Sequence, residues 1–276
     1  MNTDARLARR RLLVGGAGVI AVMTCVSKVV PEKGWTSMAR RFRREGGEGR
    51  LHSRPGQQTG SISPGLHSLG PEGGGDAILY VPTGYRPEVP APFVLSLHGA
   101  GGNERSGLYP LQELADEAGL ILLAPSSRGR TWDVILGGFG PDIDAIDHVL
   151  AAAFACCVVD PARVAVAGFS DGASYALSIG ISNGDLFPSV MAFSPGFAAP
   201  GRQHGEPRFF ISHGTGDAVL PIDRTSRRVA PQLEEAGFDV RYREFEGSHT
   251  VPPEIAREAV SWFLAESGNP AATPVR

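Results

Sequence analysis

Cysteine is scarce in this chain, and so are long hydrophobic runs and net charge of either sign. Three cysteines in 276 residues are too few for a framework of disulfide bonds. A net charge of −3 argues against a nucleic-acid-binding protein, which would carry a strongly basic surface. The 36 glycines and 22 prolines follow no Gly-X-Y period, which excludes a collagen. Hydrophobic residues still make up 42% of the chain, enough to build a packed core.

The first 30 residues differ in character from the rest of the chain. Arg9, Arg10 and Arg11 precede an uncharged run from Leu12 to Ser27, which is shorter than the ~20 residues of a membrane-spanning helix. A basic segment followed by a modestly apolar one is typical of an export signal, and this one resembles a twin-arginine signal. We expect residues 1–30 to direct export or to anchor the chain at a membrane. If they are not a signal, the protein is cytoplasmic.

Residues 31–75 show no sustained hydrophobic period. A basic run over residues 38–44 is followed by many Gly, Ser, Pro and His residues. This composition predicts a flexible linker or pro-region outside the folded unit. The folded domain is then expected over residues 76–268, with a short C-terminal tail at residues 269–276.

From residue 76 onward, short apolar runs alternate with segments of helical period. Strands are expected at residues 77–81, 93–97, 120–124, 164–167, 190–193, 209–212 and 240–245. Helical spacing of apolar residues follows positions 111, 143, 173 and 255. Strands alternating with helices predict an α/β fold whose central sheet is mostly parallel and covered by helices on both faces. Most of these strands are continuously apolar, as burial on both faces requires.

The segment Gly168-Phe169-Ser170-Asp171-Gly172 matches the pattern G-x-S-x-G. It lies between an expected strand and an expected helix, which is the context of a nucleophile elbow. In such an elbow the serine occupies a sharp, strained turn, and Gly168 and Gly172 leave room for neighbouring chain. We therefore predict that Ser170 is a catalytic nucleophile. The alternative is an ordinary strand-to-helix turn in which the serine caps the helix.

A serine hydroxyl needs a base to become a nucleophile, and His249 is the candidate for that base. It lies between the last expected strand and the last expected helix. The acid that orients a catalytic histidine should fall between serine and histidine in chain order. Asp217 does so, and it follows the strand that ends at Ser212, at the carboxyl edge of the sheet. The alternatives are a surface histidine and a carboxylate that merely stabilises its own turn.

An attack by Ser170 would create a negatively charged oxygen that needs hydrogen-bond donors. The turn His98-Gly99-Ala100-Gly101-Gly102 follows the strand at residues 93–97 and resembles the HG-type turn that supplies one backbone N–H. We assign this oxyanion-hole donor to Ala100 and the second to Asp171. The turn lacks the spacing and the lysine of a phosphate-binding loop.

Two further groups of residues carry weaker signals. Trp132 and Asp133 follow the strand at residues 120–124, where they either line the pocket or simply pack in the loop. Three acidic residues near the start of the long helix are expected to be a first-turn charge cluster rather than a metal site, because no histidine cluster with ligand spacing accompanies them. They are Asp142, Asp144 and Asp147.

Together these motifs resemble the α/β-hydrolase family, and within it the compact carboxylesterases, phospholipases and polyhydroxybutyrate-depolymerase-like proteins. The likeness rests on four stretches, at residues 97–103, 164–173, 213–221 and 247–253. It implies hydrolysis of a small-molecule or lipid-like carboxylic ester through an acyl-enzyme, without a cofactor or metal. Unlike many relatives, the chain has no long insertion that would form a lid.

Two other functions fit the same residues. A peptidase or an acyltransferase would use identical catalytic parts on the same scaffold. A binding protein with a hydrolase fold and no activity would also retain the fold, although here every required side chain is present. The sequence favours no particular oligomeric state.

Overall fold

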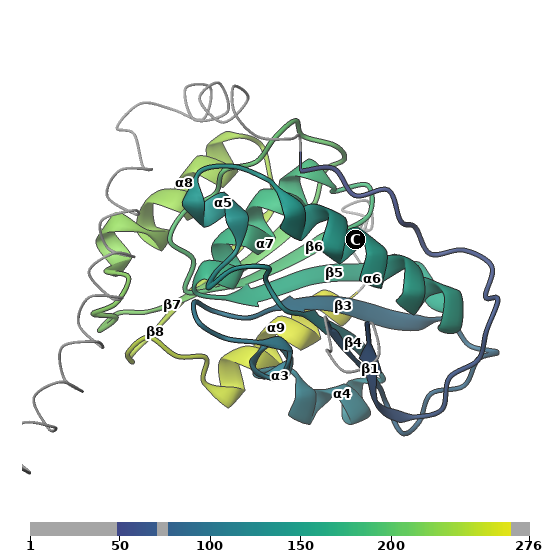
Figure 1. Ribbon diagram of the computed structural model, residues 1–276. Helices are drawn as coiled ribbons and strands as arrows, with labels where there is room; N and C mark the ends of the chain where they lie inside the picture. Colours follow the sequence, from purple (N-terminus) through teal and green to yellow (C-terminus); the bar gives the residue numbers. More distant parts are fainter. Residues whose placement is uncertain (1–48, 71–76, 266–276) are drawn as a thin grey trace, which may run out of the picture.

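The computed structural model describes residues 49–70 and 77–265 of the chain. The expected export signal at residues 1–30 and the expected tail at residues 269–276 lie outside the described residues. Within them, strands and helices alternate and build a layered α/β architecture (Figure 1).

Eight strands of the described chain form one sheet, in the order β1-β2-β4-β3-β5-β6-β7-β8. Five neighbouring pairs, from β4-β3 through β7-β8, are parallel, and β2 runs antiparallel to both β1 and β4. The mostly parallel sheet predicted from the sequence is therefore confirmed. The strands are β1 (Gly65–Leu69), β2 (Ala77–Val81), β3 (Ala91–Leu97), β4 (Ile121–Pro125), β5 (Val159–Phe169), β6 (Ser189–Phe193), β7 (Arg208–Gly214) and β8 (Val240–Phe245).

Helices cover both faces of the sheet (Figure 1). One face carries α5 (Asp133–Leu136), α6 (Pro141–Cys156), α7 (Asp171–Ser182) and α8 (Ser226–Glu235). The other carries α3 (Glu104–Leu108), α4 (Gln112–Ala118) and α9 (Pro253–Leu264), and a short 3-10 turn, η1, spans Ile222–Arg224. Because β3, β4 and β6 are buried along their whole length, their side chains fill both cores, as continuous apolar runs require.

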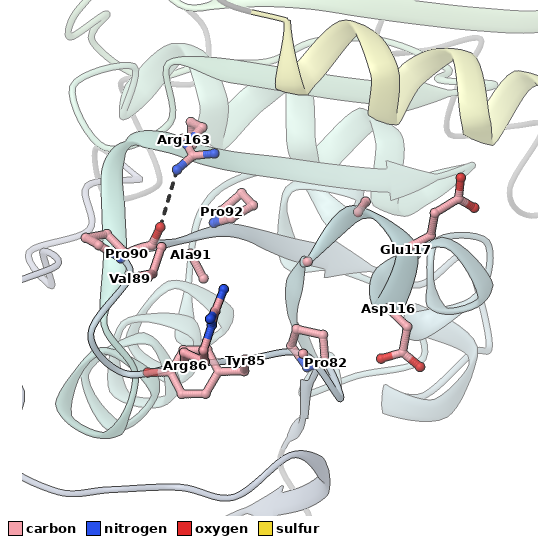
Figure 2. A pocket seen from close by; sticks show the side chains of 13 residues that line it. Pro82, Tyr85, Arg86, Val89, Pro90, Ala91, Pro92, Asp116, Glu117 and Arg163 are labelled. Carbon is pink, nitrogen blue, oxygen red and sulfur yellow. Dashed lines mark hydrogen bonds between the residues drawn. The ribbon is translucent and has the colours of Figure 1, made fainter.

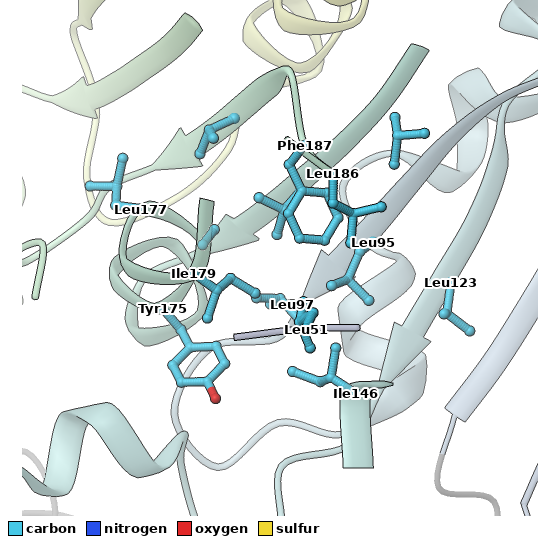
Figure 3. Packing of buried hydrophobic residues seen from close by; sticks show 14 of the residues in the cluster. Leu51, Leu95, Leu97, Leu123, Ile146, Tyr175, Leu177, Ile179, Leu186 and Phe187 are labelled. Atoms are coloured by element: carbon cyan, nitrogen blue, oxygen red, sulfur yellow. The ribbon is translucent and has the colours of Figure 1, made fainter. Parts of the chain in front are cut away.

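The larger core lies between the sheet and α6 and α7. Figure 3 shows Leu95 and Leu97 of β3, Ile146 of α6 and Ile179 of α7 in this cluster. Leu51, which precedes all the strands, belongs to the same cluster and is fully buried. The chain before β1 therefore contributes to the main hydrophobic core.

This burial corrects the linker expected at residues 31–75 for its described part, residues 49–70. Residues 49–54 lie against α6 and α7, where the N–H of Leu51 donates to Asn183 Oδ1 at 2.8 Å and the N–H of Ser53 donates to Asp147 Oδ1 at 2.8 Å. Strand β1 then pairs with β2 over five residues. The folded unit thus begins no later than Gly49, not at residue 76. In the described part of the chain, no helix is long and apolar enough to cross a membrane.

Candidate active site

Ser170 lies in the sharp turn between β5 and α7. Its backbone has φ 58° and ψ −121°, a strained combination for a residue with a side chain. A Cβ atom on Gly168 would overlap the carbonyl group of Gly172, and one on Gly172 would overlap the carbonyl groups of Leu97 and His98. The turn can therefore close only with glycine at both positions, as the G-x-S-x-G pattern predicts.

The structure brings the three predicted triad side chains together. His249 Nε2 lies 2.8 Å from Ser170 Oγ, and His249 Nδ1 lies 2.6 Å from Asp217 Oδ2. An ionised Asp217 can only accept hydrogen bonds, so Nδ1 of His249 carries the proton and donates to it. In the neutral imidazole, Nε2 is then free to accept the proton of the serine hydroxyl. The ring of His249 packs on Phe169, with the ring centroids 4.6 Å apart.

Asp217 is buried and receives more hydrogen bonds than the sequence suggested. Oδ1 accepts the N–H groups of Val219 and Leu220, each at 2.8 Å, while Oδ2 faces both His249 and Nε2 of His213 at 3.1 Å. Burial alone would raise the pKa of Asp217, but the bonds from His213, His249 and Leu220 outweigh it and hold the pKa well below its usual range. Asp217 therefore keeps its charge beside His249.

The contact of His213 with the Asp217 carboxylate was not predicted from the sequence. It is fully buried, and its Nδ1 lies 2.7 Å from Ser226 Oγ. Its Nε2 faces two acceptors, the Leu220 carbonyl and Asp217, so Nε2 carries the proton and Nδ1 accepts from Ser226. The available signal was its spacing of four residues from Asp217.

The two expected oxyanion donors lie on the segments that flank Ser170. In β3 and β5, Leu97 pairs with Gly168, so the turn after β3 lies beside the nucleophile. A Cβ atom built on Gly99 would lie 3.4 Å from Cβ of Ser170. In the described part of the chain, neither Ala100 nor Asp171 donates its N–H to a backbone acceptor in a turn, loop or cap. Neither N–H group is therefore used by these backbone contacts.

Topology explains why these segments meet. From β3 the chain crosses to β4 on one side, and β5 lies on the other side, so the connections diverge at the carboxyl ends of β3 and β5. Such a switch point leaves a crevice at this edge of an open α/β sheet. Asp217 and His249 follow β7 and β8 at the same edge. Every predicted site residue thus follows the carboxyl end of a strand, at one end of the sheet.

A separate cavity of about 350 Å³ lies at the opposite edge of the sheet. Figure 2 shows Arg86, Ala91 and Arg163 among its lining side chains, at the amino end of β3. Arg163 donates to the Pro90 carbonyl there at 3.3 Å. This cavity is remote from the carboxyl edge that carries Ser170 and contributes none of the predicted catalytic residues.

Two carboxylates of the acidic cluster in α6 accept hydrogen bonds from backbone N–H groups. Asp142 is buried, and its carboxylate accepts the N–H groups of Arg128 and Asp133 at 2.6 and 2.7 Å. Asp147 accepts backbone N–H groups from residues 52 and 53. In the described residues, no group of three or more His, Cys, Asp or Glu side chains is arranged to hold a metal ion.

No protein-family model matches the chain. Among curated proteins, it is similar to feruloyl esterase C of Emericella nidulans, with 26% identity over 159 residues. The match covers 54% of this chain and 57% of that protein, so the chain spans a little over half of this relative's length.

Solved esterase structures resemble about 70% of the chain. Esterase PE8 superimposes with a TM-score of 0.55 and 21% identity, covering 72% of this chain and 97% of that one. A ferulic acid esterase of Anaeromyces mucronatus, solved with ferulic acid, superimposes with a TM-score of 0.53 and 20% identity. The match covers 73% of this chain and 90% of that one. An S-formylglutathione hydrolase of Agrobacterium tumefaciens superimposes with a TM-score of 0.52 and 17% identity. This match covers 68% of this chain and 88% of that one. The α/β-hydrolase fold implied by the sequence motifs is confirmed.

Proposed function

We propose that the protein is a serine hydrolase that cleaves carboxylic esters through an acyl-enzyme. The observation that carries this proposal is the continuous set of contacts from Ser170 through His249 to Asp217, with separations of 2.8 and 2.6 Å. Such a chain of hydrogen bonds is what converts a hydroxyl into a nucleophile. The likeness to a curated feruloyl esterase and to solved esterases supports the same chemistry.

The first half of the reaction follows from these positions. Ser170 Oγ attacks the ester carbonyl while its proton passes to Nε2 of His249, and Asp217 stabilises the imidazolium through Nδ1. The carbonyl oxygen becomes negative and accepts hydrogen bonds from the N–H groups of Ala100 and Asp171. When the tetrahedral intermediate collapses, His249 gives its proton to the departing alcohol, and the acyl group stays on Ser170.

Hydrolysis of the acyl-enzyme reverses these roles. His249 takes a proton from water, the resulting hydroxide adds to the acyl carbon, and the same two N–H groups hold the second oxyanion. Collapse of this intermediate releases the carboxylic acid and returns the proton to Ser170 Oγ. Every proton moves between His249 and a reacting oxygen, so these steps require no cofactor.

We propose a small-molecule ester as the substrate class. The relatives whose names specify a substrate act on esters or thioesters of small acids, one of them solved with ferulic acid. The side chain of His249 is 14% exposed and Ser170 is 8% exposed, so both residues have limited access to solvent. Export remains part of the proposal because residues 9–13 have the order of a twin-arginine signal.

Substitution of the nucleophile tests the proposal. We expect Ser170→Ala to abolish hydrolysis of p-nitrophenyl acetate, a loss of at least about 10⁴-fold, while the circular dichroism spectrum stays unchanged. A fluorophosphonate probe should label the natural protein and not this variant. Equal esterase rates in the two proteins would refute the mechanism. Absence of both labelling and turnover in the natural protein would favour a silent binding protein.

A further inference from the structure

The loop between β4 and α5, residues 126–132, contacts the turn that carries one oxyanion donor. The carbonyl of Arg130 accepts the N–H of Gly101 at 2.7 Å. The indole N–H of Trp132 donates to the His98 carbonyl at 2.8 Å, and the N–H of Ser127 donates to Nε2 of His98 at 3.0 Å. Three hydrogen bonds thus attach this loop to His98, two residues before Ala100, and to Gly101, the residue after it.

The same loop also reaches the other donor. The hydroxyl of Thr131 donates to Asp171 Oδ2 at 2.6 Å. Asp171 is 2% exposed, and burial raises the pKa of its carboxyl group, while the Thr131 hydroxyl and the nearby His249 and His98 act in the opposite direction. A buried carboxylate beside a developing oxyanion would repel it if the side chain were free to turn. Its bond to Thr131 fixes the side chain of Asp171, the residue whose N–H is the second donor.

The loop is itself held at both ends. Asp142 of α6 accepts the N–H of Arg128 and the N–H of Asp133, and it is almost completely buried. Trp132 is fully buried and stacks on Tyr175 of α7, with ring centroids 5.1 Å apart, while its other neighbour is the His98 ring at 4.7 Å. A loop anchored in this way can fix the groups it contacts, which is what preorganised stabilisation of charge requires.

We propose that Thr131 and Trp132 are positioning residues that fix the two oxyanion donors, Thr131 through the Asp171 carboxylate and Trp132 through the His98 carbonyl. The proposal rests on the proposed ester hydrolysis by Ser170. The side-chain hydrogen bonds of both residues in the described structure go to the donor segments rather than to the triad, so both act through the donors. Because the oxyanion exists only in the transition state and the intermediates, loss of either contact should lower kcat more than it raises KM.

Thr131→Val removes the hydroxyl and keeps the branched shape, and Thr131→Ser keeps the hydroxyl. We expect Thr131→Val to lower kcat for p-nitrophenyl acetate about tenfold with KM within about twofold, since removing a whole donor costs ~10² or more. Thr131→Ser should restore kcat to within about threefold of the natural protein. A trifluoromethyl ketone, whose adduct with Ser170 carries an oxyanion, should bind Thr131→Val about tenfold more weakly.

Trp132→Phe tests the second contact, because it keeps an aromatic ring against Tyr175 and removes the indole N–H. It should also lower kcat and ketone affinity in parallel, by about tenfold each. If a variant lowers the melting temperature but leaves both quantities within twofold of the natural values, its residue is structural and the proposal is wrong for it. Equal losses in Thr131→Val and Thr131→Ser would overturn the role of the hydroxyl.

The outcomes separate this proposal from the proposed function. If Ser170→Ala is inactive while Thr131→Val and Trp132→Phe match the natural protein in kcat and ketone affinity, ester hydrolysis stands and the positioning role falls. If Ser170→Ala hydrolyses the ester as fast as the natural protein, the catalytic proposal itself fails. The ketone measurement does not depend on turnover, so it decides the positioning role even where a variant is too slow to assay.

Discussion

A single carboxylate, Asp217, determines the electrostatics of the candidate site. Four groups lie within hydrogen-bond distance of its two oxygens: two backbone N–H groups and one ring nitrogen each from His213 and His249. A buried charge is costly unless hydrogen bonds compensate for its lost hydration, and here these four groups surround the carboxylate. Because the negative charge persists, the tautomer of His249 that leaves Nε2 free is favoured.

The lowered pKa of Asp217 predicts how stability depends on pH. A carboxyl group whose pKa is lower in the folded than in the unfolded chain stabilises the fold above its unfolded pKa, ~3.9, and this contribution is lost as the pH falls through the folded value. Above pH 5, we expect Asp217→Asn to lower the free energy of unfolding by roughly 2 kcal/mol. The difference should shrink as the pH falls below about 3.9.

Urea unfolding of both proteins at intervals from pH 6 to pH 2.5 measures this difference. Asp185, whose pKa is also lowered by its bonds to Arg50 and Arg54, is intact in both proteins and cancels in the comparison. A difference that stays constant over the whole range would mean that Asp217 is not the titrating group.

At the scale of elements, the position of the nucleophile depends on how closely α7 approaches β3. The carbonyl groups of Leu97 and His98 occupy the space where a side chain on Gly172 would lie. Any substituent there must push the start of α7 away from the end of β3. That movement would separate Ser170 and Asp171 from the Ala100 turn.

We therefore expect Gly172→Ala to be strongly destabilising, by about 3 kcal/mol or more, and to reduce esterase activity in any protein that still folds. Gly84→Ala is the matched control, because nothing lies within 4 Å of a Cβ built at that position. Its free energy of unfolding should change by no more than about 0.5 kcal/mol. Thermal unfolding and esterase rates measure both variants; similar stability of the two would contradict the close-approach argument.

Burial of the strands explains which parts of the fold and of the site could be predicted from the sequence. Seven strands were predicted within a few residues because buried strands are continuously apolar, and the parallel order then brought their carboxyl ends together. Ser170, Asp217 and His249 follow the ends of β5, β7 and β8 within four residues, so their meeting could be inferred from topology alone. The bond from Thr131 to Asp171 could not, because it joins residues 40 positions apart, one in a loop and the other at the start of α7.

Among the described elements that were not predicted, β1 and α8 were missed for different reasons. Strand β1 is an edge strand of only five residues with alternating exposure, and its Gly, His and Ser residues look like a turn-rich linker. Helix α8 contains Pro231 and several charged residues, which weaken the helical signal, while its buried stripe of Val229, Ala230 and Leu233 packs on the sheet. In both cases tertiary contacts, not local propensity, define the element.

For the whole molecule, the segment at residues 49–54 links the chain before the sheet to the helix that follows the nucleophile. Asn183, at the end of α7, accepts the N–H of Leu51 and donates to the carbonyl of Gly49, and it is fully buried. Asp185 pairs with Arg50 and Arg54. The C-terminal end of α7 is therefore packed against residues that lie outside the domain predicted from the sequence.

This arrangement predicts where the folded domain can begin. A protein starting at Gly49 should unfold at the same urea concentration as the full chain, because all described contacts remain. One starting at Asp76 loses β1, the Asn183 partners and Leu51, whose burial alone is worth about 2–3 kcal/mol. It should be destabilised by more than Leu51→Ala, for which we expect ~2–5 kcal/mol. Since Ser170 immediately precedes the other end of α7, esterase activity should fall with stability. A protein starting at Asp76 that is as stable as the full chain would show that residues 49–70 are dispensable.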